Sequence, residues 1–254
     1  MTKLPTTRAA LLGALLTVST ASAAFAQAPA SCDTVSALDK VVALNAIQNL
    51  MGRYSHLGQL RGEGTLSELF AMNTPGVSWR TPGGPIGIEQ MKERFDRPQE
   101  QLQPGVLRMH TMFTPVIEIA GDGQTAKGVW DSFGPSVGGP NDEGGWFQAK
   151  YGVDFVKENG VWKIWHLQVY AIYTTPYNES ITQSAKERLA KAAAGGGAPG
   201  GAPPGGPPRG DGPAPIMYPR PAHAWSYDGK SVEQGPEIPS PYCHFDPNDV
   251  YILK

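Results

Sequence analysis

The chain has 254 residues, of which 40% are hydrophobic and 17% are charged, and its formal net charge is -2. This length and composition suit one large domain or one domain with an appendage, and they exclude a chain that is disordered throughout. Residues 1–26 hold two of the basic residues and none of the acidic ones, so the chain without them is more acidic still. An acidic balance argues against a nucleic-acid-binding surface and against a patch for anionic membranes.

Residues 1–26 have the organisation of a secretory signal peptide. Lys3 and Arg8 precede the apolar run AALLGALLTV, and small residues follow up to Ala26. We expect cleavage after Ala26 and export to the periplasm or to the outside of the cell. An uncleaved membrane anchor is the weaker alternative, because the apolar run is much shorter than the roughly 20 residues that span a bilayer.

The two cysteines, Cys32 and Cys243, stand near the two ends of the mature chain. In an oxidising compartment they can form one disulfide that ties the C-terminal segment to the N-terminus, and free or intermolecular thiols are the alternative. No histidine stands at ligand spacing from either cysteine. We therefore expect no zinc site and no other bound metal.

Helices are predicted in the first part of the mature chain. Apolar residues recur at helical spacing from Leu38 to Tyr54, which predicts a helix over about 36–59. Three further elements follow in order: a short helix over 66–72, a strand over 76–80 and a helix over 88–95.

After Pro104 the sequence changes to alternating, β-branched and aromatic residues, which are typical of antiparallel strands. We predict strands over 107–119, 125–134, 146–157 and 161–173. Helices followed by a strand meander indicate an α+β fold in which helices cover one face of a sheet. The sequence contains no dinucleotide-binding glycine fingerprint, no P-loop and no nucleophile elbow.

Composition divides the chain into one domain and three appended segments. We place the domain over 33–178 and a helical extension over 179–194. Residues 195–215 consist almost entirely of Gly, Ala and Pro, which predicts a linker. Residues 216–254 are rich in Pro and aromatic residues without a sustained period, so we expect irregular chain packed against the domain as a lid, a dimer arm or a tail.

The dipeptide Asn159-Gly160 predicts the pairing of the last two strands. A two-residue type I′ turn there places Val153 opposite His166 and Tyr151 opposite Gln168. One face then carries Tyr151, Val153, Phe155, Ile164, His166, Gln168 and Tyr170. The other face carries Lys150, Asp154, Val156, Lys163, Trp165, Leu167 and Val169. We interpret the first face as the wall of a pocket.

Four segments stand in an order that resembles a known family. They are Arg53-Tyr54 leading to LSELF at 66–70, GPIGIEQMKERF at 84–95, HTMFTPVIEIAGDGQTAKGVW at 110–130, and DFVKENGVWKIWHLQVY at 154–170. Together they resemble the SnoaL-like branch of the nuclear-transport-factor-2-like superfamily, over about residues 38–174. The resemblance implies a cystatin-like α+β barrel: a cone-shaped, curved antiparallel sheet wrapped around N-terminal helices. It also implies a homodimer or a higher homo-oligomer.

The same resemblance bears on activity. Family enzymes, including polyketide cyclases, scytalone-type dehydratases and ketosteroid-type isomerases, use acid and base side chains inside the cone without an organic cofactor. Other members bind or assemble without catalysis, so the fold alone does not assign a function. The segments TPVIEIAGDGQTAKGVW and KYGVDFVKENGVWKIWH are similar to those of lyases that release formaldehyde from lignin-derived diarylpropanes.

The candidate catalytic residues are His110, His166, Tyr54 and Tyr151. A histidine in an apolar cavity can act as a general acid or base near neutral pH, and a buried tyrosine can donate a proton. The candidate substrate-binding residues are Gln59, Trp79, Trp130, Gln168 and Tyr170, which could orient or stack on an aromatic ligand. Packing in the core is the alternative for every one of these residues.

Other polar residues are weaker candidates. The family pattern has an aspartate five residues after the tyrosine of the "RY" pair, and Gln59 occupies that position here, so this carboxylate base is absent. Asp131 and Asp154 could replace it, but the predicted register points Asp154 away from the pocket. His56 and Arg108 have no predicted direction and are expected to be partly solvated.

We therefore expect an exported, cofactor-independent lyase that dehydrates a hydroxylated aromatic small molecule or cleaves a carbon–carbon bond in it, with a lignin-derived dimer as one candidate. One alternative is a non-catalytic periplasmic carrier for an apolar or aromatic ligand. Another is a structural dimerisation module whose cone is filled by its own side chains. None of the three involves a nucleic acid, or a membrane after signal cleavage.

Overall fold

A computed structural model describes residue 32, residues 34–60, 66–81, 84–96, 104–138 and 143–194, residue 227, and residues 236–251. The predicted signal peptide and the predicted linker over 195–215 lie outside the described residues. No helix within the described ranges combines the length and apolar character needed to cross a membrane.

The described elements follow the predicted order, with an additional short strand over 84–86. The helical elements are α1 (Ala37–Leu60), the 3-10 helix η1 (Leu66–Leu69), α2 (Ile88–Phe95) and α3 (Ile181–Ala193). The strands are β1 (Ser78–Thr81), β2 (Gly84–Ile86), β3 (Val106–Arg108), β4 (Thr111–Ile119), β5 (Thr125–Gly138), β6 (Gly145–Glu158) and β7 (Val161–Pro176). The single strand predicted over 107–119 is thus divided, and His110 lies between β3 and β4.

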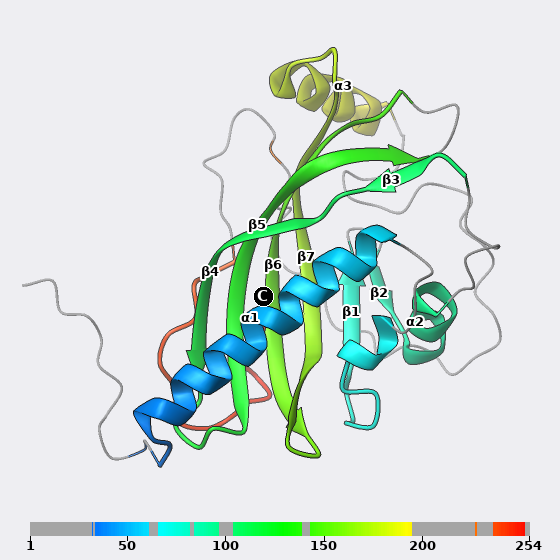
Figure 1. Ribbon diagram of the computed structural model, residues 1–254. Coiled ribbons are helices and arrows are strands. Elements are labelled where there is room, and N and C mark those ends of the chain that lie inside the picture. Colours follow the sequence, from blue (N-terminus) through cyan, green and yellow to red (C-terminus); the bar gives the residue numbers. More distant parts are fainter. Residues whose placement is uncertain are drawn as a thin grey trace, which may run out of the picture.

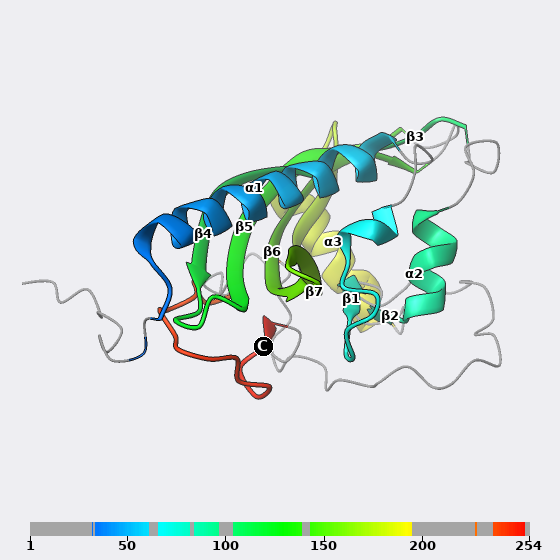
Figure 2. The ribbon, with the colours of Figure 1, turned by 60° about the horizontal axis from the view of Figure 1, so that its bottom comes forward.

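The strands form one curved sheet in the order β2-β1-β7-β6-β5-β3, and β4 pairs with β5 beside β3. Strands β5, β6 and β7 are antiparallel neighbours, whereas β1 runs parallel to β7. Helix α1 crosses one face of this sheet (Figures 1 and 2). This arrangement confirms the predicted α+β fold class.

Helix α1 forms where the sequence supplies both an N-terminal cap and an apolar stripe. The Asp39 backbone N–H donates to Ser36 Oγ at 3.1 Å, which satisfies one of the free donors at the start of the helix. Along the helix, Ile47, Met51 and Tyr54 are buried against the sheet at spacings of four and three residues. We call the sheet face under α1 the inner face.

The turn between β6 and β7 has the predicted geometry. Asn159 and Gly160 have φ values of 53° and 79°, as a type I′ turn requires. Phe155 pairs with Ile164 as predicted, but the register then shifts by one residue. The shift is a β-bulge at Trp165, and beyond it Asp154 pairs with His166 and Val153 pairs with Leu167.

The bulge corrects the predicted faces of His166, Gln168 and Tyr170, which precede a second register shift between Ala171 and Tyr173. The pairs Val153 with His166 and Tyr151 with Gln168 were wrong, because one extra residue in a strand moves the following side chains to the other face. Leu167 and Val169 therefore lie on the inner face with Tyr151. His166, Gln168 and Tyr170 lie on the opposite face, which we call the outer face.

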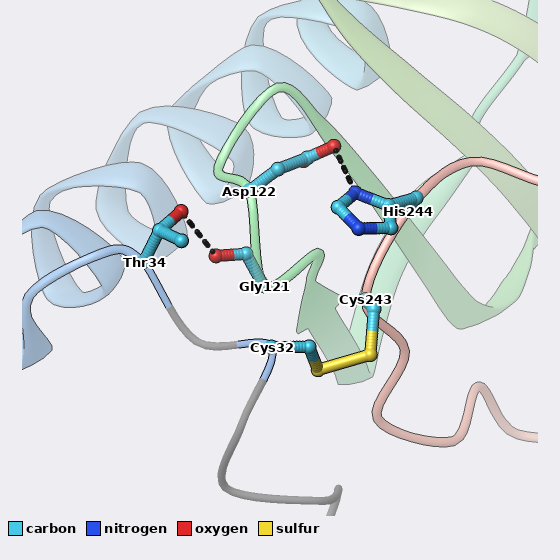
Figure 3. The surroundings of a disulfide bond; sticks show 6 residues. All are labelled: Cys32, Thr34, Gly121, Asp122, Cys243 and His244. Atoms are coloured by element: carbon cyan, nitrogen blue, oxygen red, sulfur yellow. Dashed lines mark hydrogen bonds and ion pairs between the residues drawn. A yellow bond between two sulfur atoms is a disulfide. The ribbon is translucent and has the colours of Figure 1, made fainter.

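The described C-terminal segment, residues 236–251, lies on the outer face as irregular chain (Figures 1 and 2). A disulfide joins Cys32 to Cys243. Of the two alternatives that the sequence left open, an intramolecular disulfide or free or intermolecular thiols, the structure has the disulfide. Cys32 and Thr34 meet Cys243 and His244 at the turn between β4 and β5 (Figure 3). There Thr34 Oγ1 donates to the Gly121 carbonyl oxygen at 3.2 Å, and the Gly121 N–H donates to the Tyr242 carbonyl oxygen at 2.9 Å.

Candidate active site

The inner face brings His110 and Tyr151 together from separate elements. The phenol oxygen of Tyr151, in the middle of β6, lies 2.9 Å from His110 Nδ1. Tyr151 is fully buried, and burial is the main reason that its pKa is raised well above the ordinary tyrosine value; the neighbouring Tyr54 raises it further. The phenol is therefore neutral at physiological pH, and it can donate a proton or a hydrogen bond.

The position of His110 is set by its backbone and by an aromatic neighbour. Ser55 Oγ, on α1, donates to the His110 carbonyl oxygen at 2.6 Å. The imidazole packs edge-on against Phe147, with ring centroids 5.5 Å apart. His110 is half-buried, unlike Tyr151, so it is the member of the pair that a ligand from solvent can reach.

Tyr54 extends the pair towards the core. Its ring packs edge-on against Tyr151 with centroids 6.2 Å apart, and it packs edge-on against Phe70 as well. Burial raises the Tyr54 pKa, and a hydrogen-bonding interaction with Trp79 partly opposes that rise. Tyr54 is therefore a second neutral phenol, and the predicted residues Tyr54, Trp79, His110 and Tyr151 do gather on one side of the sheet.

Ser132 is a polar residue of the inner face that the sequence reasoning missed. It lies on β5 opposite Met112 and Ala149, two positions after Trp130 and thus on the same face. Its side chain is fully buried, and its Oγ finds no hydrogen-bond partner among the described residues. Strand alternation counted from Trp130 would have found it.

The inner face becomes apolar towards the turn between β6 and β7. Trp130 packs edge-on against Phe155 with centroids 5.8 Å apart, and both are buried. A Cβ at Gly128 would lie 2.5 Å from the Trp130 ring, so glycine is required for this packing. Trp130 is therefore a core residue here, and the polar groups occupy the end of the inner face near His110.

Three predicted site residues, His166, Gln168 and Tyr170, belong instead to a buried polar cluster on the outer face. His166 Nδ1 lies 3.2 Å from Asp154 Oδ2, and the His166 ring stacks on Trp165. Tyr170 donates to the Tyr251 carbonyl oxygen at 2.7 Å. Because the sheet separates them from Tyr151, they cannot act on the same bound molecule as the inner-face residues.

The remaining candidates are dispersed. Asp131 accepts from Lys150 at 2.8 Å and from Thr114 at 2.9 Å on the outer face. Gln59 lies near the end of α1, and its side chain is outside the described part of the structure. His56 lines an open hollow on the exposed side of α1 with Asn49, Gly52, Arg53 and Leu57. Within the described ranges, no three His, Cys, Asp or Glu side chains gather in a way that could hold a metal ion.

Comparison with known proteins identifies the family. Residues 39–168, half of the chain, match the family described as the SnoaL-like domain, and the chain belongs to this family within the nuclear-transport-factor-2-like fold. A search of curated proteins finds no match.

Several solved structures are similar to this chain at low sequence identity. A hexachlorocyclohexane dehydrochlorinase, LinA type 2, is 20% identical, with a TM-score of 0.48 over 57% of this chain and 95% of that one. LinA type 3 from Novosphingobium barchaimii LL02 is 20% identical, with a TM-score of 0.47 over 57% and 97%. A nuclear-transport-factor-2-like protein from Salmonella enterica serovar Typhimurium is 18% identical, with a TM-score of 0.41 over 56% and 97%.

Proposed function

We propose that the protein is an exported, cofactor-independent acid/base enzyme whose reacting groups are His110 and Tyr151 on the inner face of the cone. The observation that carries this proposal is the 2.9 Å contact between the two side chains, one half-buried and one fully buried. An imidazole beside a phenol that stays protonated is a matched base and acid.

The pair can move two protons in one direction. With its proton on Nδ1, the His110 imidazole donates to the Tyr151 phenol oxygen, and the Nε2 lone pair acts as the base. When Nε2 removes a proton from a substrate, the Nδ1 proton can pass to Tyr151 as the Tyr151 hydroxyl proton passes to a leaving hydroxyl group. The products are water and an unsaturated molecule, and His110 ends as the neutral imidazole with its proton on the other nitrogen.

The substrate class that we propose is a hydroxylated aromatic small molecule. The inner face offers aromatic side chains at Tyr54, Phe147 and Trp79, which suit a flat ring, and the buried Ser132 hydroxyl can accept or donate one hydrogen bond to it. Lignin-derived diarylpropanes are the first candidates, on the sequence resemblance described above. In such a substrate, departure of a benzylic hydroxyl and deprotonation of the neighbouring alcohol would release water and formaldehyde.

The experiment is to incubate the purified mature protein, starting at Gln27, with lignin-derived dimers and hydroxylated polycyclic phenols without added cofactor. Products are followed by mass spectrometry for wild type, His110→Ala and Tyr151→Phe, with His56→Ala as the matched control because His56 is exposed on α1. We expect loss of water or formaldehyde in wild type and His56→Ala alone. Saturable binding with intact substrate would contradict catalysis and indicate a carrier, and neither binding nor turnover would indicate a structural module.

A further inference from the structure

The C-terminal cover, which we define as residues 236–251, is held on the outer face by polar contacts from its middle to its C-terminal end. In its middle, the backbone N–H groups of Gly121 and Asp122 donate to the carbonyl oxygens of Tyr242 and Cys243 at 2.9 and 3.1 Å. Towards its C-terminal end, Lys127 pairs with Asp249, and the Tyr251 N–H donates to Asp154 Oδ2 at 3.0 Å. The cover contributes no strand to the sheet, so it lacks the ladder of backbone hydrogen bonds that would make it part of the domain.

Beneath the cover lies the buried pair of Asp154 and His166. Asp154 is 1% exposed and His166 is 4% exposed. Phe245 of the cover lies against Trp165, with ring centroids 4.5 Å apart, and Tyr251 lies over Gly152, where a Cβ would be 2.5 Å from its ring. The cover therefore excludes water from a carboxylate and an imidazole that would otherwise be at the surface.

Asp154 depends on the cover for one of its hydrogen bonds. Its Oδ2 accepts from the Tyr251 N–H, while its Oδ1 finds no partner among the described residues. A buried carboxylate with an unsatisfied oxygen is costly, so hydration of Asp154 opposes closure of the cover.

The disulfide between Cys32 and Cys243 is the covalent tie that favours the closed state. Cys32 precedes α1, and Thr34 is hydrogen-bonded to Gly121, so the disulfide fixes the cover at the turn between β4 and β5 (Figure 3). Both cysteines are half-buried, and a reductant can approach them. Without the disulfide, the covalent link between the cover and the domain is the chain that contains the Gly/Ala/Pro-rich segment 195–215, and the non-covalent contacts alone hold the cover in place.

We propose that this disulfide is a redox latch: its reduction releases the C-terminal cover and exposes Asp154 and His166 to solvent. The reductant is a protein dithiol of the thiol–disulfide oxidoreductase class. One of its thiolates attacks a sulfur of the Cys32–Cys243 bond and displaces the other cysteine as a thiolate. Its second thiol then resolves the mixed disulfide, so the reductant becomes a disulfide and both cysteines become thiols in a two-electron exchange.

The experiment measures amide hydrogen exchange in the full mature chain, oxidised, reduced by dithiothreitol, and as the Cys32→Ser/Cys243→Ser double variant. The reporting amides are those of Gly121, Asp122 and Tyr251, and the reference amides are those in the middle of α1. Loss of a typical disulfide predicts exchange faster by on the order of 100-fold at the reporting amides, with the α1 amides unchanged. Unchanged exchange everywhere would overturn the proposal, because the cover would then be held without the latch. Equal acceleration in α1 would also overturn it, because the disulfide would then support the whole domain.

A chemical readout tests the exposed pair directly. Diethylpyrocarbonate acylates accessible histidines, and His166 and His56 provide a buried and an exposed site in the same chain. In the double serine variant, which has no thiols to compete, we expect His166 to react several-fold faster than in the oxidised wild type, with His56 unchanged. Equal rates for His166 in the two proteins would contradict release of the cover.

Discussion

Each face of the same sheet places a histidine beside an oxygen atom of another side chain. The surroundings of the two pairs differ. On the inner face, His110 is half-buried and faces a neutral phenol. On the outer face, His166 faces a carboxylate, stacks on Trp165 and lies under the C-terminal cover. The comparison teaches that the two histidines differ in their covering: His110 is partly exposed, whereas His166 and Asp154 are buried under the C-terminal cover.

Removing one tyrosine hydroxyl from each face should give the largest difference in kcat/KM between two variants. We expect Tyr151→Phe to lower kcat/KM for the proposed reaction by about 100-fold, the scale of lost proton transfer. Tyr170→Phe should leave kcat/KM within a few-fold, and it should lower the free energy of unfolding by about 1 kcal/mol through the lost hydrogen bond to Tyr251. Steady-state kinetics and urea denaturation of both variants test this. Equal kinetic losses would remove the distinction between the faces.

Substitution of two aspartates on the outer face compares the stability contribution of a buried pair with that of a partly exposed ion pair. Asp154→Ala breaks a buried pair and removes the acceptor of the Tyr251 N–H, so we expect a loss of about 3 kcal/mol. Asp131→Ala removes an ion pair with Lys150 in which both side chains are more than a quarter exposed, and its cost should stay below about 1 kcal/mol. Denaturant titration of the two variants measures the difference, and similar losses would contradict a structural role confined to the buried pair.

Alkaline pH should destabilise both faces together. Burial is the largest cause of the raised pKa values of Tyr54 and Tyr151 on the inner face and of Tyr170 and Tyr251 near Asp154. A pKa that is higher in the folded state gives stability that is complete below the unfolded value near 10 and is lost as pH rises above it. The expected slope is about 1.4 kcal/mol per pH unit for each tyrosine that ionises only on unfolding. Denaturant midpoints between pH 8 and 11 test this, and stability that is level up to pH 11 would contradict it.

Two glycine substitutions are expected to change stability in opposite directions. Gly128→Ala would place a Cβ 2.5 Å from the Trp130 ring, so we expect a loss of about 1–3 kcal/mol. Gly52→Ala, in the middle of α1, meets no atom within 4 Å and should gain about 0.5–1 kcal/mol from helix propensity. Thermal unfolding of the two variants compares them directly. A loss of stability in Gly52→Ala would show that the exposed side of α1 contacts something else.

The sequence predicted the fold class and the part of the inner face nearest the turn between β6 and β7 for identifiable reasons. The spacing of Ile47, Met51 and Tyr54 is a local property of the chain, and so is the turn at Asn159-Gly160. These features settle α1 and the pairing of Phe155 with Ile164 without any distant contact.

The bulge at Trp165 depends on distant residues and could not be predicted in this way. The Trp165 indole donates to the Pro75 carbonyl oxygen at 2.9 Å, and its ring packs on Phe245, so residues 80 to 90 positions away hold the bulge in place. A register counted from the turn therefore placed His166, Gln168 and Tyr170 on the wrong face. The proximity of His110 to Tyr151 was not predicted as a pair either, because the interruption between β3 and β4 sets the direction of His110.

The most direct measurement of the central claim compares His110→Ala with His166→Ala in both activity and stability. We predict that His110→Ala lowers turnover by at least about 100-fold. The free energy of unfolding of this variant should differ from that of the wild type by less than about 1 kcal/mol. We predict the reverse for His166→Ala, with turnover within a few-fold and a clear loss of stability. If His166→Ala removed turnover from a stably folded protein while His110→Ala did not, the assignment of the inner face as the active site would be wrong.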